Sequence, residues 1–110
     1  MASLLAKLYN GDLLTAHSTA FALQAMADCS TFPDRLKAGT TGSWKVAHKT
    51  GTSGTWNGTT AATNDVGILT SPDGSRFAVA VFLAESRSTS KDRAAAIARI
   101  ASSAIRHYRP

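Results

Sequence analysis

The sequence predicts an α/β protein of the α+β type: a three-stranded antiparallel sheet with two N-terminal helices and a C-terminal helix. Three observations predict this class. Apolar residues recur at helical spacing toward both ends of the chain, β-favouring segments follow one another in its middle, and turn residues separate those segments. The chain has 110 residues, and nothing in its composition indicates a second domain, so we predict one domain over residues 1–110.

Two helices are predicted in the first third of the chain. Residues 3–9 favour a short helix that ends at the turn signal Asn10-Gly11. A second helix is expected from Ala16 to about Asp28, with Thr15 or Ser18 as its N-cap. Residues 29–42 are then expected to form a loop with one turn near residues 35–37. The apolar face of the second helix is expected to consist of Phe21, Ala22, Ala25, Met26 and Cys29.

Three strands are predicted between residues 44 and 84. The first covers residues 44–50, and the second covers residues 61–69 after an interruption rich in Gly, Thr and Ser. A hairpin turn at residues 71–74, Ser-Pro-Asp-Gly, leads into the third strand, because Pro presets one turn dihedral and Gly tolerates a positive φ. The third strand, residues 76–84, is apolar on both faces, which is typical of a central strand covered on both sides by helices.

The last helix is expected from Lys91 to about Tyr108, with an N-cap among residues 86–90. Basic residues at its end suit the negative end of the helix dipole; these are Arg106, His107 and Arg109. Its buried stripe is expected to consist of Ala94, Ile97, Ala98, Ala101, Ala104, Ile105 and Tyr108.

Composition excludes several classes of function. Lys and Arg number 12 against 7 Asp and Glu, but they are scattered and do not interleave with aromatic residues, so nucleic-acid binding is not expected. The one cysteine, Cys29, cannot form an internal disulfide. No His, Cys, Asp or Glu cluster has metal-ligand spacing, so no metal or cofactor is expected. Neither a secretory leader nor an apolar span is present, which predicts a cytoplasmic protein without membrane contact.

One segment carries a specific resemblance. "VAHKTGTSGT", residues 46–55, contains the Lys-Thr-Gly element typical of class A serine β-lactamases, and "RLKAG", "TNDVGIL", "PDG" and "AVAVFLAES" follow the order and spacing of that family's C-terminal region. The amino-acid sequence around this element resembles that of the extended-spectrum subgroup of class A. The resemblance implies a single partial β-lactamase-like domain, the C-terminal part of the β-lactamase/transpeptidase-like fold. It also implies that full-length relatives are exported.

The resemblance further implies a substrate-binding strand, here vestigial. Lys49 would supply positive potential beside the nucleophile, and the hydroxyls of Thr50 and Thr52 would bind the carboxylate of the drug. The N–H of Thr52 would form half of an oxyanion hole, aimed at charge that develops in the transition state. Gly51 lets a flat substrate lie against the backbone. Ser53 would line the same rim, and Arg35 would back up carboxylate recognition with its planar guanidinium.

No catalytic residue is assigned. In the family, the serine nucleophile of Ser-x-x-Lys, a Ser-Asp-Asn loop and a general base lie upstream of the matching region. The one Ser-x-x-Lys here, residues 88–91, falls at the start of the last helix, where capping is expected. His48, Ser53 and Asp65 are not expected to form a replacement triad, because His48 and Ser53 would point to opposite faces of a strand and Asp65 would have to reach over from the next strand. We expect His48 to be half-buried. Efficient β-lactam hydrolysis by this chain alone is therefore not expected.

The strand of residues 76–84 raises a question about partners. In the family it has a further neighbour, and without one it would be an exposed apolar edge. We therefore predict a homodimer through the Arg76–Ala84 strand, or by exchange of the terminal helix, with a small anionic or carboxylate ligand. Two alternatives stay open. One is an interaction or regulatory module with a resistance-related role, acting through this strand or the basic C-terminal helix. The other is a new enzyme activity at a dimer interface.

Overall fold

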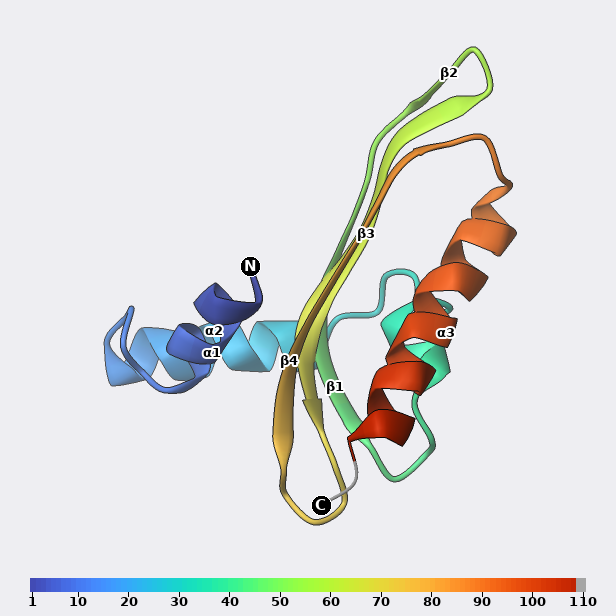
Figure 1. Ribbon diagram of the computed structural model, residues 1–110. Coiled ribbons are helices and arrows are strands. Elements are labelled where there is room, and N and C mark those ends of the chain that lie inside the picture. The colour runs from blue at the N-terminus through green and yellow to red at the C-terminus, as the bar shows by residue number, and fades with distance from the viewer. Residues whose placement is uncertain (109–110) are drawn as a thin grey trace.

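The computed structural model describes residues 1–108, and its elements follow the predicted order (Figure 1). The α+β prediction is confirmed, and the sheet gains a short fourth strand. The elements are α1 (Ala2–Tyr9), α2 (Ala16–Ala27), the 3₁₀ helix η1 (Leu36–Gly39), β1 (Lys45–Thr52), β2 (Thr55–Trp56), β3 (Thr59–Thr70), β4 (Arg76–Ser86) and α3 (Ser90–His107). Arg109, expected near the end of the last helix, lies outside the described residues.

The fourth strand, β2, lies within the segment predicted as an interruption. Thr55 pairs with Thr60 and Trp56 with Thr59, so β2 and the start of β3 form a hairpin that extends beyond the rest of the sheet (Figure 1). Asn57 and Gly58 connect them with φ of 49° and 77°. Two positive φ values are what a two-residue hairpin turn requires, and Asn-Gly is a favoured pair for it.

The longest strand, β3, is the centre of the sheet. It pairs antiparallel with β1 on one side and with β4 on the other. Among the described residues β4 pairs with β3 alone. It is therefore an edge strand, as the resemblance implied, and not the central strand that its apolar pattern indicated. The pattern reflects helices on both faces, because α1 contacts β4 from one side and α3 from the other.

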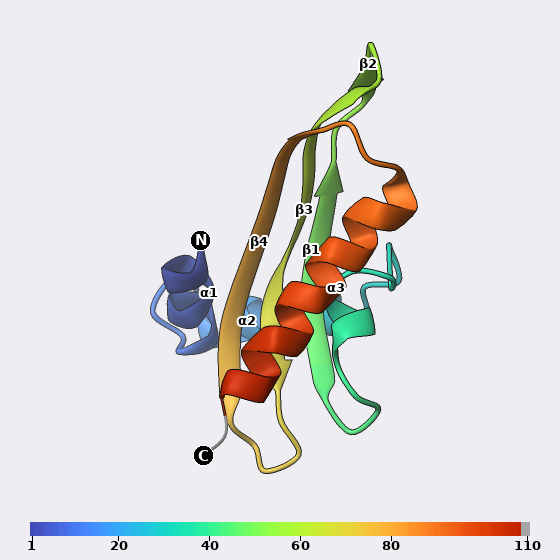
Figure 2. The ribbon, with the colours of Figure 1, turned by 45° about the vertical axis from the view of Figure 1, so that its right-hand side comes forward.

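Helices cover the two faces of the sheet in pairs. Figure 2 shows α3 in front of the sheet, with α1 and α2 on the opposite side. The core lies under α3, where Leu36 of η1 packs with Val81 of β4 and with Ile97 and Ala101 of α3. η1 and α3 approach closely at Gly39, where a Cβ would lie 2.1 Å from the Ala98 carbonyl oxygen. The glycine therefore allows this contact.

The N-caps of the two longer helices agree with the predictions. The Thr15 hydroxyl accepts a hydrogen bond from Ser18 N at 3.2 Å, and the Thr89 hydroxyl accepts one from Asp92 N at 3.1 Å. The buried stripe of α3 is centred on Ala94, Ile97 and Ala101, whereas Ala104 and Tyr108 are exposed.

The predicted apolar face of α2 is partly wrong. Phe21 is 73% exposed, Ala25 is also exposed, and Cys29 follows the helix as a half-buried loop residue. The inward stripe instead contains the buried Thr19 and the half-buried Ala22, Leu23 and Met26. The stripe is narrow because α2 packs mainly on one strand, β1. Among residues 1–108, no helix combines the length and the apolar character that a membrane span needs.

Candidate carboxylate-binding site

The Lys-Thr-Gly segment lies at the end of β1, on an edge that no described strand covers. Ser53 N donates to Ala62 O at 2.9 Å, just beyond the strand. Because hydrogen-bonded and non-hydrogen-bonded pairs alternate in an antiparallel ladder, the N–H of Thr52 points away from β3, toward the open edge. A Cβ placed on Gly51 would meet no atom of the described residues within 4 Å. The backbone is therefore open to a ligand at this point.

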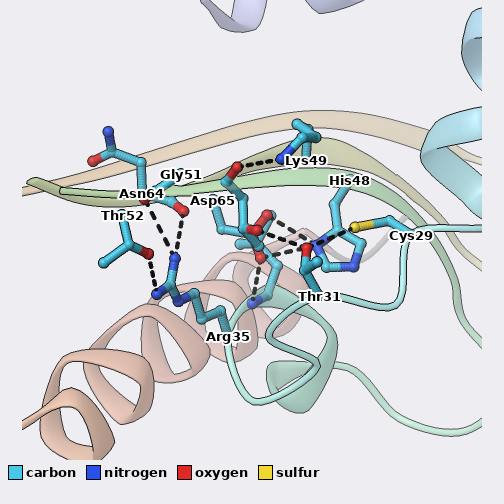
Figure 3. A network of polar contacts seen from close by, with 11 residues as sticks. Cys29, Thr31, Arg35, His48, Lys49, Gly51, Thr52, Asn64 and Asp65 are labelled. Atoms are coloured by element: carbon cyan, nitrogen blue, oxygen red, sulfur yellow. Dashed lines mark hydrogen bonds and ion pairs between the residues drawn. The ribbon is translucent and has the colours of Figure 1, made fainter. Parts of the chain in front are cut away.

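The side chains of this segment divide between the two faces of the sheet. Lys49 is opposite Val66, whereas Thr50 is opposite Asp65 and Thr52 is opposite Thr63. Figure 3 shows Lys49 above β1 and Arg35 below it. Lys49 is exposed, and its Nζ donates to Thr50 O at 2.7 Å. The predicted residues thus meet at one strand, with the two cations on opposite sides of it.

Arg35 is buried beneath the strand and held by several groups. Its side chain is 1% exposed. Nη1 donates to Asn64 O at 3.0 Å and to Gly51 O at 3.4 Å, and Nη2 donates to Thr52 Oγ1 at 2.6 Å. The ring of Phe32 stacks on the guanidinium, with 4.0 Å from Cζ to the ring centroid. Such contacts fix a planar guanidinium in position and orientation.

The charge on Arg35 is balanced by its neighbours. Burial lowers the pKa of the guanidinium, while the nearby carboxylates of Asp34 and Asp65 raise it and the positive charge of Arg93 lowers it further. An arginine stays protonated under such opposing effects. Arg35 therefore places a permanent positive charge directly under Thr52.

The hydroxyl groups at the site have different roles. Thr52 Oγ1 accepts from Arg35, so its own hydrogen is free to donate to an anion at the edge. Thr50 Oγ1 shares a hydrogen bond of 2.8 Å with Thr31 Oγ1, which in turn lies 3.3 Å from Cys29 Sγ. Ser53 uses its hydroxyl locally, donating to Gly54 O and accepting from Ala62 N. Of the three predicted hydroxyls, Thr52 is thus the best placed to bind a carboxylate.

A buried pair of side chains on the α3 side of the sheet was not predicted. His48 was expected to be half-buried, but it is 1% exposed, and Asp65 does reach it: Nδ1 lies 2.9 and 3.0 Å from the two carboxylate oxygens. Across from His48 stands Gly67, where a Cβ would lie 2.8 Å from the Cβ of His48. The available sequence signal was Gly67, which lies two residues after Asp65 in the predicted strand. His48, Asp65 and Ser53 do not form a triad, because the Ser53 hydroxyl bonds to backbone groups.

The Ser-x-x-Lys segment is a helix cap, as predicted. Thr89 caps α3 through Asp92 N, and Ser88 O accepts a hydrogen bond from Arg93 Nη1 at 2.7 Å. Ser88 and Lys91 are exposed at the start of the helix. This segment therefore has a structural explanation that needs no nucleophile.

The antiparallel sheet, with Lys-Thr-Gly on its open edge and an arginine beneath, agrees with the β-lactamase-like class that the sequence resemblance implied. Residues 1–108 match the beta-lactamase enzyme family, Beta-lactamase2, and the chain belongs to that family. The resemblance to this family found in the sequence is thereby confirmed, and the similar proteins include some that are named extended-spectrum β-lactamases.

Three similar proteins illustrate the match. The chain is 42% identical to Beta-lactamase VEB-1 of Pseudomonas aeruginosa over 110 residues, covering 98% of this chain and 37% of VEB-1. It is 43% identical to Extended-spectrum beta-lactamase PER-1 of Pseudomonas aeruginosa, covering 94% of this chain and 33% of PER-1. The crystal structure of TLA-3 extended-spectrum beta-lactamase superposes with a TM-score of 0.93 at 42% identity, covering 96% of this chain and 39% of TLA-3. The chain thus spans between 33% and 39% of the length of these relatives.

Proposed function

We propose that this chain binds the carboxylate of a β-lactam at the open edge of β1 and does not hydrolyse the ring efficiently by itself. The observation that carries the proposal is the hydrogen bond from Arg35 Nη2 to Thr52 Oγ1, at 2.6 Å. It holds the hydroxyl oxygen still and leaves the hydroxyl hydrogen to donate outward. Charge-assisted hydrogen bonds of this kind are the stronger class in proteins.

The surrounding charges and backbone support the same proposal. Lys49 contributes positive charge from the other face of the strand, and Thr52 N–H points to the same edge. A carboxylate, or an oxyanion derived from a carbonyl, is the ligand that such donors suit. Weak β-lactam turnover follows from what the site lacks: Ser53 is committed to backbone groups, and Ser88 lies beside a helix cap.

The test is a nuclear magnetic resonance titration of the ¹⁵N-labelled full chain with benzylpenicillin and with its methyl ester. The acid is expected to shift the amides of Gly51 and Thr52, whereas the ester, which lacks the carboxylate, should shift them far less. Thr52→Val keeps the shape of the side chain and removes the donor, so its affinity should fall about tenfold or more. Equal binding of acid and ester would contradict the proposal.

A lysine pair on β1 provides a matched control. Lys45 and Lys49 are both exposed. They lie on the same face of β1, because successive side chains of a strand alternate between its two faces and these two residues are four positions apart. Lys49→Ala should weaken binding roughly threefold, the effect of one exposed charge, and Lys45→Ala should change it little. Intact-mass measurement after incubation should find no penicilloyl adduct. An adduct, or rapid turnover of a chromogenic cephalosporin, would contradict the proposal that this chain does not hydrolyse β-lactams efficiently by itself.

A second candidate function is assembly through β4, and we propose a second copy of this chain as the partner. Edge strands with exposed apolar side chains pair readily with other strands. β4 is such an edge, and Phe82 on it is 59% exposed. Edge-to-edge pairing about a two-fold axis would continue the sheet across the dimer.

Molar mass in solution tests this assembly. Light scattering should give twice the 11.5 kDa mass of the chain. Phe82→Lys places a charge on the edge and should produce a monomer, while Phe21→Lys, the same change on α2 at a residue 73% exposed, should leave the dimer intact. Val81 is unsuitable for this test because it belongs to the core. A monomeric wild type, or a dimer that survives Phe82→Lys, would contradict edge pairing; the second result would favour exchange of α3.

A further inference from the structure

Asp65 occupies a connecting position in the site. It lies on β3, is fully buried, and uses both carboxylate oxygens. Oδ2 accepts a hydrogen bond from Leu36 N at 3.1 Å, and both oxygens lie within 3.0 Å of His48 Nδ1. A buried carboxylate is costly unless it is paired and hydrogen-bonded, and these two contacts satisfy Asp65.

The two donors are sequence neighbours of the candidate binding residues. Leu36 directly follows Arg35, and His48 directly precedes Lys49. The Asp65 carboxylate therefore links η1 to β1 at His48, and the Arg35 guanidinium links the start of η1 to β1 again at Gly51 and Thr52 (Figure 3). The result is a closed ring of contacts that includes both Arg35 and Asp65.

The imidazole fits this role in one protonation form. An ionised carboxylate can only accept, so Nδ1 of His48 carries the hydrogen, and in the neutral ring Nε2 carries none. Nε2 is buried and has no hydrogen-bond partner among residues 1–108. An unpartnered lone pair is compatible with that neutral form, whereas an N–H at Nε2 would be a buried donor without an acceptor.

We propose that Asp65 is a positioning residue, which holds the backbone of η1 and the imidazole of His48 together and so sets the Arg35 guanidinium beneath Thr52. This inference rests on the proposed carboxylate site for its effect on binding. Its structural part, the dependence of Arg35 on Asp65, can be measured without any ligand.

The test compares three variants of the full chain. Asp65→Ala removes both contacts, and benzylpenicillin affinity should fall about tenfold or more, as expected for losing an oriented charge-assisted donor. Asp65→Asn keeps an acceptor for Leu36 N and should fall only about threefold. Asp34→Asn is the matched control: Asp34 is exposed, and its charge also acts on Arg35, but it makes no such link. Its affinity should stay within about twofold of the wild type.

Two spectroscopic signals separate positioning from a general loss of stability. In ligand-free wild type, the Arg35 Nε–H resonance should be sharp, and imidazole ¹⁵N shifts should show the Nδ1–H form of His48. In Asp65→Ala the Arg35 signal should broaden or average, with Asp34→Asn unchanged. In Asp65→Asn the side-chain amide donates to Nδ1, so His48 should change to the Nε2–H form.

The outcomes are distinct. If Asp65→Ala remains folded and leaves both the Arg35 signal and the affinity unchanged, the positioning role is wrong. If Asp65→Ala does not fold, Asp65→Asn provides the comparison, and an unchanged His48 form together with unchanged affinity overturns the role. If wild type does not bind benzylpenicillin, the proposed function fails, while the ligand-free Arg35 and His48 signals still decide whether Asp65 positions Arg35.

Discussion

The two faces of the sheet are covered to very different degrees. Under α3 and η1, Leu36, Leu69 and Ile97 are completely buried. On the other face, α1 and α2 leave large apolar side chains in water: Leu4 is 50% exposed, and Phe82, which lies on this face opposite Asn64, is 59% exposed. The α3 face therefore carries most of the packing, and the α1 face is only partly closed.

The polar groups follow the same division. Arg35, His48 and Asp65 all lie on the α3 side and are at most 1% exposed, whereas Lys49 lies on the other side and is exposed. A buried polar network needs well-packed walls, because each unsatisfied group inside costs free energy. The comparison teaches that the geometry of the candidate site depends on the packing of η1 against α3, and much less on α1 and α2.

A matched pair of leucine substitutions should produce the largest difference between the faces. Leu36→Ala removes a completely buried side chain from the core, and it should lower the free energy of unfolding by about 3 kcal/mol. Leu4→Ala, at a half-exposed position of α1, should lower it by less than about 1 kcal/mol. Chemical denaturation of both variants measures the two values. Equal losses would show that the α1 face is as well packed as the α3 face.

Substitutions of two glycines test the contact between η1 and α3, with a smaller expected loss of stability than Leu36→Ala. In Gly39→Ala the new Cβ would lie 2.1 Å from Ala98 O and 2.8 Å from the Cβ of Ala101, so η1 must move away from α3. Overpacking of this kind costs about 2 kcal/mol. Because Arg35 immediately precedes η1, carboxylate affinity should fall as well.

The control for Gly39 is a glycine in open space. Within the part of the chain that the structure describes, a Cβ on Gly54 would meet no atom within 4 Å, so Gly54→Ala should change stability by no more than about 0.5 kcal/mol. Calorimetric melting together with a benzylpenicillin titration distinguishes the two sites. A Gly39→Ala protein with wild-type stability and affinity would mean that close contact between η1 and α3 is not needed.

Much of the fold could be predicted from the sequence because its signals are local. Thr15 was one of the two predicted caps of α2, Thr89 lies within residues 86–90 where the cap of the last helix was predicted, and the turn at residues 71–74 was recognisable from Pro and Gly. The hairpin at Asn57-Gly58 carried a strong turn signal but was missed, because its strand β2 has two residues and no periodicity. The exposure of Phe21 could not be predicted either, since it depends on how much of α2 the rest of the molecule covers.

The candidate site also has one part that could be predicted from the sequence and one part that could not. The positions of Lys49 and Thr50 on a strand follow from the residue pattern, whereas Thr52, beyond the predicted end of that strand, and Arg35 nearby were expected only from the family resemblance. The His48–Asp65 pair depends on the register of β1 against β3, because a shift of one strand by one residue would place the two side chains on opposite faces of the sheet. Register is set by long-range packing, so the buried pair was beyond what local patterns predict.

The smallest expected effect concerns an exposed carboxylate, Asp73, which contrasts with the buried Asp65. A hydrogen bond from the Ser71 hydroxyl, and then one from Ser75 N at 2.8 Å, hold the pKa of Asp73 below its ordinary value of 3.8. A group whose pKa is lower in the folded state stabilises the fold above its unfolded pKa, and this contribution is lost as the pH falls through the folded pKa. The stability difference between wild type and Asp73→Asn should therefore shrink below about pH 4.

Ser71→Ala provides the cross-check, because it removes the largest cause of the lowered pKa. Carboxyl ¹³C titration should show the pKa of Asp73 rising toward its ordinary value in this variant, and the Ser71→Ala/Asp73→Asn protein should lose little beyond Asp73→Asn alone. The turn is solvent-exposed and contacts neither Arg35 nor the buried His48–Asp65 pair, so benzylpenicillin affinity should not change. A change in affinity would mean that the end of the β3–β4 hairpin is coupled to the site through the sheet, and that the α3 face does not hold Arg35 on its own.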